Sequence, residues 1–209
     1  MKRTLAPLLT LVLTLSASTA LRAQDLALPA PQKTGGLPLM EALARRASGR
    51  NFDAARELST QQLANLLWAG FGVNRPDGRR TAPSASNLQD IDIYVLMKPG
   101  AYVYDAAHHT LRLVVAQDLR ALGGKPEAPV TLIYVADLSK RASGTVESKQ
   151  NVANINSGFI SENVYLYCAS EGLATVYRGG YDRQALTEKL KLRPDQGLVA
   201  SQPVAYPKP

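Results

Sequence analysis

Some segments of the chain repeat apolar residues at the spacing of a helix, and others at the spacing of a strand. Together they predict a domain built from both helices and strands. Residues 37–47 and 59–71 carry apolar residues at helical spacing. In the second segment, Ser59 and Gln62 have the spacing of a capping box, in which each side chain satisfies a free backbone donor of the other. The apolar residues that share one face of the first segment are Leu39, Met40, Leu43 and Ala44. Both segments are therefore predicted helices.

The middle of the chain has the alternation and β-branched content of strands. Residues 91–97 (IDIYVLM) alternate and then run apolar, and residues 130–136 (VTLIYVA) have the composition of a central strand. Two shorter runs, 101–104 and 111–115, flank the stretch DAAHHT. This spacing predicts a hairpin between them.

A long helix is predicted over residues 146–170, where apolar residues recur at helical intervals. Its second half is apolar nearly all round, so we expect it to be buried. Ala153, Ser157 and Ser161 lie four apart and would let another helix approach closely. That helix could belong to a second subunit or to the same chain.

The last third predicts a strand over residues 173–177, a helix over 182–192 and a final strand over 198–204. The mixture indicates an α+β domain, which we place at residues 38–209. Residues 24–37 are rich in Pro, Gly and Ala, and we interpret them as a linker or an N-terminal arm.

Residues 1–23 have the pattern of an export signal. A short positive start precedes an apolar run over residues 5–15, which is too short to span a bilayer as a permanent helix. Small residues follow, and we expect cleavage after Ala20 or Ala23. The expected location is periplasmic or secreted, with no stable membrane anchor after cleavage.

The net charge argues against nucleic acid as a partner. The chain has 24 basic and 17 acidic residues, a formal charge of +7. Cleavage would remove Lys2, Arg3 and Arg22 and no acidic residue, which lowers the charge from +7 to +4. An excess of this size is mild for a protein that binds a polyanion.

The sequence offers no marked catalytic group and no metal site. It has one cysteine, Cys168, and two histidines, His108 and His109, which are too few to form a zinc site. Cys168 lies among apolar residues, where a buried, inert thiol is the expected state. The chain has no G-x-S-x-G motif, so we predict neither a catalytic residue nor a metal ligand.

The stretch ARRASGRNF places Arg46, Ser48 and Arg50 at alternate positions. In a non-helical backbone, alternate side chains point to one side. Two guanidinium groups and a hydroxyl on one side would suit a phosphate monoester, whose oxygens match planar bidentate donors. The alternative is a solvated basic turn at a helix C-terminus, where arginine complements the helix dipole. Arg45 lies outside the alternation and is expected at the surface.

Two further stretches could contact a ligand. TAPSASNLQ carries Ser84, Asn87 and Gln89, whose donors and acceptors could bind the edge of a heterocycle. VYRGGYD carries Gly179 and Gly180, which permit a flat ligand to approach the backbone closely. Taken alone, each stretch has the composition of an ordinary turn.

Taken in order, the three stretches resemble the FMN-dependent nitroreductase family. The family's flavin-phosphate motif, Arg-x-Ser-x-Arg/Lys followed by x-Phe, stands here at residues 46–52, and its Pro-Ser-x-x-Asn-x-Gln segment stands at residues 83–89. ENVYLYCASEGLATVYRGGYD and LVASQPVAYP are similar to the family's last third, so the resemblance covers residues 39–207. Residues 59–89 are most similar to the branch that contains the azoline-forming dehydrogenases.

The resemblance implies an α+β fold with a mixed, largely antiparallel sheet flanked by helices. It also implies an intertwined homodimer with FMN at the subunit interface. The implied FMN ligands are Arg46, Ser48, Arg50, Ser84, Asn87, Gln89, Arg178, Gly179, Gly180 and Lys208. The first three, with Lys208, would hold the phosphate and ribityl chain. The residues of the 84–89 stretch would come from the partner subunit, and the backbone of residues 178–180 would face the flavin N5 edge.

The implied function is that of an exported FMN-dependent oxidoreductase, which passes two electrons through bound flavin to a small acceptor such as a nitroaromatic or a quinone. An exported protein meets little NAD(P)H, so NAD(P)H is not the expected donor and the donor stays open. The alternative is a non-catalytic flavin- or ligand-binding protein on the same fold. A peptide-modifying dehydrogenase of the azoline branch is a third hypothesis.

Overall fold

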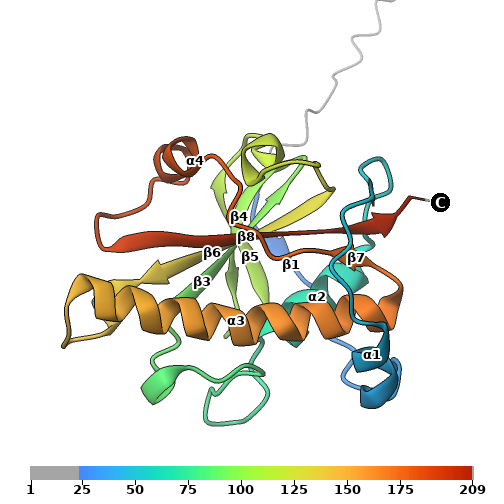
Figure 1. Ribbon diagram of the computed structural model, residues 1–209, viewed down its shortest axis with the longest axis horizontal. Coiled ribbons are helices and arrows are strands. Elements are labelled where there is room, and N and C mark those ends of the chain that lie inside the picture. The colour runs from blue at the N-terminus through green and yellow to red at the C-terminus, as the bar shows by residue number, and fades with distance from the viewer. Residues whose placement is uncertain (1–23, 209) are drawn as a thin grey trace, which may run out of the picture.

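The computed structural model describes residues 24–208, so the export signal expected over residues 1–23 lies outside the described part. An eight-stranded sheet forms its centre, in the order β1-β5-β4-β3-β6-β8-β2, and β7 pairs with β8 (Figure 1). The strands are β1 (Leu26–Ala27), β2 (Phe52–Asp53), β3 (Ile91–Met97), β4 (Gly100–Asp105), β5 (Thr110–Val115), β6 (Val130–Asp137), β7 (Ala174–Thr175) and β8 (Gln196–Pro207). Every pairing among these strands is antiparallel.

Helices cover both faces of the sheet. They are α1 (Leu39–Arg45), α2 (Thr60–Phe71), α3 (Val146–Glu171) and α4 (Arg183–Lys189), with short 3-10 turns η1 (Ala85–Asn87), η2 (Arg120–Gly123) and η3 (Leu138–Lys140). The long helix α3 crosses one face and α4 lies on the other (Figure 1). The prediction of an α+β fold with a largely antiparallel sheet flanked by helices is confirmed.

The period of two along the strands divides the core between the two faces. In β6, Leu132 and Tyr134 pack with the residues of α2 and α3, whereas Ile133 and Val135 pack with those of α4. β6 lies between β3 and β8, and all eight of its residues are buried. A strand covered on both faces needs apolar residues at every position, which explains why residues 130–136 show no alternation.

The predicted start of α2 is confirmed in detail. Ser59 Oγ accepts a hydrogen bond from the Gln62 amide at 3.1 Å, and Gln62 Oε1 accepts one from the Ser59 amide at 3.0 Å. Both bonds of the capping box are therefore present. The apolar stripe of α2 is buried against α3 within the same chain.

The small-residue stripe of α3 packs inside the chain. Ala153, Ser157 and Ser161 are all buried, and the Gln202 side chain of β8 donates a hydrogen bond to the Ser161 carbonyl at 3.4 Å. Of the two alternatives, the structure therefore shows contact with the chain's own sheet.

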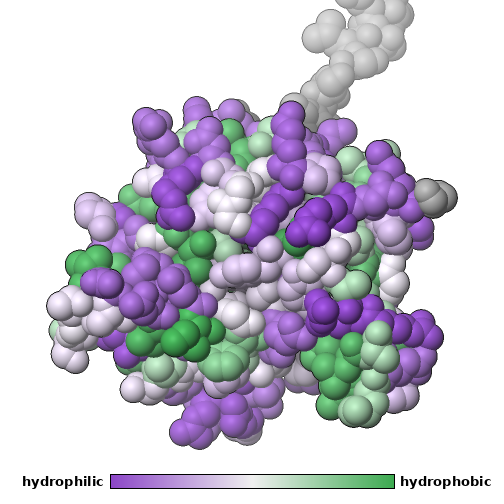
Figure 2. Space-filling model, viewed as in Figure 1, coloured by the Kyte–Doolittle hydropathy of each residue, from purple (hydrophilic) through white to green (hydrophobic). Residues whose placement is uncertain are grey.

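Two apolar faces are not covered by the described part of the chain. Leu39 and Met40 of α1 are 63% and 75% exposed, and α1 buries only Ala42. In the first half of α3, Ile155 is 60% exposed. Phe159, where the second half begins, is 45% exposed, so the prediction that the second half is buried is wrong at this position. Figure 2 shows apolar patches over both helices. Periodicity identifies residues that share a face, but it does not show whether the same chain covers that face.

The terminal segments are tied to the sheet more closely than expected. The arm over residues 24–37 forms β1, which pairs with β5, and Gln32 exchanges hydrogen bonds with Asn65 of α2. The strand predicted over 173–177 is reduced to the two residues of β7. β8 is longer than predicted and pairs with β6, β7 and β2 in turn. Within residues 24–208, none of the helices is both long and apolar enough to cross a bilayer.

Gly124 is expected to tolerate no side chain. Its φ is +98°, and a Cβ atom there would lie 2.0 Å from the Gly180 carbonyl oxygen. We predict that Gly124→Ala lowers the free energy of unfolding by about 3 kcal/mol or more, from left-handed backbone strain plus the clash. Gly78→Ala is the matched control, since φ is +79° and nothing lies within 4 Å. It should cost only the strain, about 1–2 kcal/mol. Equal losses in urea unfolding would contradict the clash.

Candidate functional site

The segment that follows α1 brings Arg46 and Ser48 to one side chain of α3. The Arg46 guanidinium lies over the ring of Tyr165, with its carbon 5.4 Å from the ring centroid. Ser48 Oγ lies 3.0 Å from the hydroxyl oxygen of Tyr165. Tyr165 is itself buried, with 8% exposure. The two alternate residues of the motif therefore share one side, as predicted.

Arg50 and Lys208 are brought close together by the edge of the sheet. β2 begins two residues after Arg50 and pairs with the end of β8, with Phe52 opposite Pro207. The Lys208 amide continues the ladder by donating to the Asn51 carbonyl at 2.9 Å. Both side chains are exposed beside this edge.

The cradle, defined here as Arg46, Ser48, Arg50 and Lys208, carries uncompensated positive charge. The side chains of its three cations have no hydrogen-bond or ion-pair partner among residues 24–208. Arg45 differs, because it pairs with Glu41 of the same helix and is exposed, as expected for a surface residue. The cradle can therefore receive an anion without first breaking an ion pair.

The glycine turn lies on the other side of Tyr165. The Tyr177 amide donates to the Tyr165 hydroxyl at 2.8 Å, and Arg178 pairs through its backbone with Ser201. Gly179 and Gly180 are exposed, and a Cβ atom on either would meet nothing within 4 Å. Their amides donate no hydrogen bond to any described residue. Free backbone donors thus face open space beside the cradle.

The side chain of Arg178 supports the fold, and its backbone N–H and carbonyl are both paired with Ser201, so the free donors of the turn are those of Gly179 and Gly180. Its guanidinium donates to the Gly123 carbonyl at 3.0 Å and to the Pro126 carbonyl at 3.3 Å. Burial lowers the pKa of this guanidinium below its ordinary value. The arginine therefore braces the loop that carries Gly124, on which the glycine turn rests.

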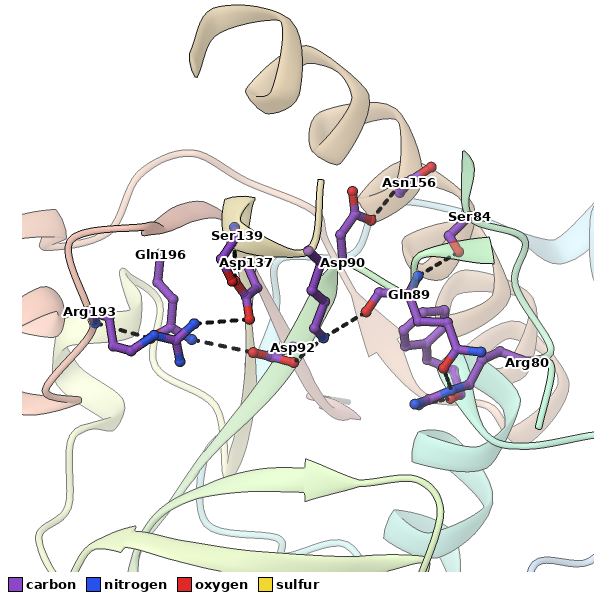
Figure 3. Close-up of polar contacts among 12 residues, drawn as sticks. Arg80, Ser84, Gln89, Asp90, Asp92, Asp137, Ser139, Asn156, Arg193 and Gln196 are labelled. Carbon is purple, nitrogen blue, oxygen red and sulfur yellow. Dashed lines mark hydrogen bonds and ion pairs between the residues drawn. The ribbon is translucent and has the colours of Figure 1, made fainter. Parts of the chain in front are cut away.

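The 84–89 stretch folds into a self-braced loop elsewhere on the chain (Figure 3). Ser84 Oγ accepts from the Gln89 amide at 2.9 Å. The Gln89 side chain accepts from Arg80 Nε at 2.9 Å and donates to the Gly78 carbonyl at 3.0 Å. Ser86, Asn87 and Gln89 have φ values of 56°, 52° and 50°, a region that residues with side chains seldom occupy. Asn87 is left as the exposed side chain of the three predicted ligands.

Two buried polar residues hold this loop in place. Asn156 of α3 accepts from the Ala85 amide at 3.2 Å and donates to Asp90 Oδ1 at 2.6 Å (Figure 3). Asn156 and Asp90 are 2% and 3% exposed, and Arg141 lies 3.4 Å from the other carboxylate oxygen. The sequence analysis missed both residues. The available signal was an asparagine between Ala153 and Ser157, inside the buried stripe of α3.

The single chain separates the predicted ligands into two groups. Asn156 and Tyr165 are nine residues apart on α3, which places the two anchors about 13 Å apart along the helix axis. The cradle and the glycine turn meet at Tyr165, whereas Ser84, Asn87 and Gln89 gather near Asn156. That the two groups come from different subunits stays a prediction.

Cavities of the single chain do not enclose the candidate site. A cavity of about 160 Å³ adjoins the cradle and is lined by Gly49, Tyr165 and Cys168. A larger one of about 500 Å³ lies between the arm, α2 and the other side of α3, beside Trp68. Neither of these two cavities is lined by Arg46, Arg50 or the glycine turn.

Cys168 has the properties of an inert thiol. It is 1% exposed and lies in the apolar core under α3. Burial raises the pKa of its thiol far above the usual range, so the thiolate that would react is not formed near neutral pH. The expectation of a buried thiol is confirmed.

Comparisons with known proteins agree with one another on the family. A model described as the nitroreductase family matches residues 43–206. A candidate nitroreductase of Ralstonia eutropha, known from its crystal structure, is 38% identical with a TM-score of 0.85, covering 90% of this chain and 92% of that one. A candidate nitroreductase of Methanocaldococcus jannaschii is 26% identical over 171 residues, 75% of this chain and 86% of its own.

A more distant solved structure shares the fold alone. A chain of the Escherichia coli microcin synthetase complex, bound to truncated pro-microcin, aligns with 100% of this chain and 79% of its own. Its TM-score is 0.67 and its sequence identity is 18%.

Replacing Asn156 should release the 84–89 loop. We predict that Asn156→Ala lowers the free energy of unfolding by about 2–3 kcal/mol, because Asp90 and the Ala85 amide lose their partner. Asn154→Ala is the control on the same helix, since its side chain is exposed and accepts only from Gln150. It should change stability by less than about 0.5 kcal/mol. Equal effects of the two variants in urea unfolding would show that the buried contacts do not hold the loop.

Proposed function

Because the chain belongs to the nitroreductase family, we propose that it is an exported FMN-dependent oxidoreductase that transfers two electrons to a small acceptor, such as a nitroaromatic or a quinone. Membership in the family supports the oxidoreductase class. One observation supports the flavin assignment: Arg46 and Ser48 both contact Tyr165, whose hydroxyl also accepts from the Tyr177 amide at the start of the glycine turn.

The cradle fits the phosphate end of FMN. Arg46, Arg50 and Lys208 supply exposed positive charge, and Ser48 supplies an exposed hydroxyl. Guanidinium groups bind phosphate oxygens in a bidentate geometry, and the dianion gains several charge-assisted hydrogen bonds. Riboflavin, which lacks the phosphate, would lose these contacts.

The glycine turn fits the flavin ring. The pairing of Arg178 with Ser201 fixes the turn, so the amides of Gly179 and Gly180 are oriented before any ligand binds. Donors fixed in this way stabilise negative charge that develops on a flavin N5 edge. When bound, FMN would supply the two-electron chemistry, and the chain would supply binding, orientation and the local field.

A second copy of the chain would complete the site. The α3 residues that anchor the Asn87 loop and the cradle lie about 13 Å apart along the helix axis, and the apolar faces of α1 and α3 are exposed. A homodimer would bury these faces and bring Asn87 of the partner subunit to the flavin. Proteins with the nitroreductase fold are often dimers, which supports this arrangement.

The proposed location rests on residues 1–23, and the location in turn limits the choice of electron donor. Their export pattern supports a periplasmic or secreted protein, where NAD(P)H is scarce. Another reductant would then supply the electrons. Fractionation of cells that express the full chain tests the location, and a product that keeps residues 1–23 in the cytoplasm would contradict it.

The alternative function is a non-catalytic flavin-binding protein. The export pattern favours it, because the family's usual donor would be absent. Repeated turnover separates the two functions: the enzyme's flavin should be reduced by a donor and reoxidised by a quinone for many cycles. The azoline branch adds a peptide-modifying dehydrogenase as a third hypothesis, which incubation with azoline-containing peptides would test.

The proposed cradle predicts different FMN affinities for alanine variants of three neighbouring arginines. Arg46→Ala and Arg50→Ala should each weaken FMN binding by about 1.5–3 kcal/mol, the range for hydrogen bonds to charged groups. Arg45→Ala is the matched control, because Arg45 pairs with Glu41 and lies outside the cradle. It should leave the affinity within about twofold. Titration of apoprotein with FMN, followed by flavin fluorescence, gives all three values.

The same titration can reject the proposal. A wild-type protein that shows no flavin absorbance and does not bind added FMN would exclude an FMN enzyme. Equal affinities for the three arginine variants would instead reject the phosphate assignment while leaving flavin binding elsewhere open to test.

A further inference from the structure

Tyr165 connects the two parts of the candidate site through one hydroxyl group. Its oxygen lies 3.0 Å from Ser48 Oγ in the cradle and 2.8 Å from the Tyr177 amide, which leads into the glycine turn. These are its polar contacts within residues 24–208. Cradle and turn are 127 residues apart when counted from Arg50 to Tyr177, yet this side chain touches both.

Chemistry fixes the direction of one of these hydrogen bonds, whereas in the Ser48–Tyr165 pair either hydroxyl can donate. A backbone N–H can only donate, so the Tyr165 oxygen accepts from Tyr177. The hydroxyl hydrogen of Tyr165 is then free, and Ser48 Oγ is the acceptor within reach. When Tyr165 donates to Ser48, the hydrogen of Ser48 is released to point toward the exposed side of the cradle.

We propose that Tyr165 is a positioning residue that sets Ser48 as a hydrogen-bond donor to the flavin phosphate and so makes the site selective for FMN over riboflavin. The inference rests on the proposed function. The chain of donors runs from the Tyr177 N–H to the Tyr165 O–H, the Ser48 O–H and the phosphate. Each bond polarises the next, which strengthens the last one.

The ring of Tyr165 adds a second contribution. The Arg46 guanidinium lies over the ring at 5.4 Å, so a cation–π contact holds this cation on the same side as Ser48. Replacing tyrosine with phenylalanine keeps the ring and removes only the hydroxyl. The variant therefore isolates the hydrogen-bond chain from the packing of α3.

The test compares two flavins on one variant. We expect Tyr165→Phe to weaken FMN binding about fivefold to tenfold, the effect of losing one hydrogen bond, and to change riboflavin binding by less than about twofold. Tyr167→Phe is the matched control, because its hydroxyl donates to the Gln62 carbonyl on the α2 side at 3.2 Å. It should leave the ratio of the two affinities unchanged.

A double-mutant cycle tests the link to Ser48. If Tyr165 acts through Ser48, the double variant Ser48→Ala with Tyr165→Phe should lose no more FMN affinity than Ser48→Ala alone. Additive losses would overturn the proposal, as would an equal loss for FMN and riboflavin, which indicates a structural role. A wild-type protein that binds both flavins equally would reject the phosphate cradle itself, and the inference with it.

Discussion

Hydrogen bonds from the buried side of α3 hold three segments of the candidate site. Asn156 holds the 84–89 loop, Ser157 Oγ lies 2.9 Å from the Tyr177 hydroxyl, and Tyr165 contacts both the cradle and the glycine turn. These polar groups are buried between the helix and the sheet, where an unpaired donor or acceptor is costly. The helix can therefore hold three distant loops in one arrangement, because each loop satisfies one of its polar groups.

The same helix also divides the site. Its anchors for the Asn87 loop and for the cradle lie about 13 Å apart along its axis, and its outer face carries exposed apolar residues. An antiparallel neighbour with the same sequence would reverse that order and bring one copy's loop to the other copy's cradle. In this account, formation of the dimer both buries the apolar faces and completes the flavin site.

Much of the fold could be predicted from local patterns. The capping box at Ser59, the strand pairs around DAAHHT and the long helix follow from spacing, because their determinants lie within a few residues of one another. Coverage of the apolar face of α1 could not be predicted, since it depends on which surface meets the helix.

The candidate site could be predicted where its residues lie close together in the sequence. Arg46 and Ser48 stand at alternate positions, and both contact Tyr165, as expected from that spacing. The contacts of Tyr165 with Ser48 and of Asn156 with Ala85 join residues more than 70 positions apart, and a local hydrophobic period cannot predict such pairs. A mixed dimer tests the division of the site most directly: one chain carries Arg46→Ala with Arg50→Ala, and its differently tagged partner carries Asn87→Ala. The account predicts one tight FMN site per mixed dimer, although each parent variant binds weakly. Weak binding by the mixed dimer would contradict a site shared between two subunits.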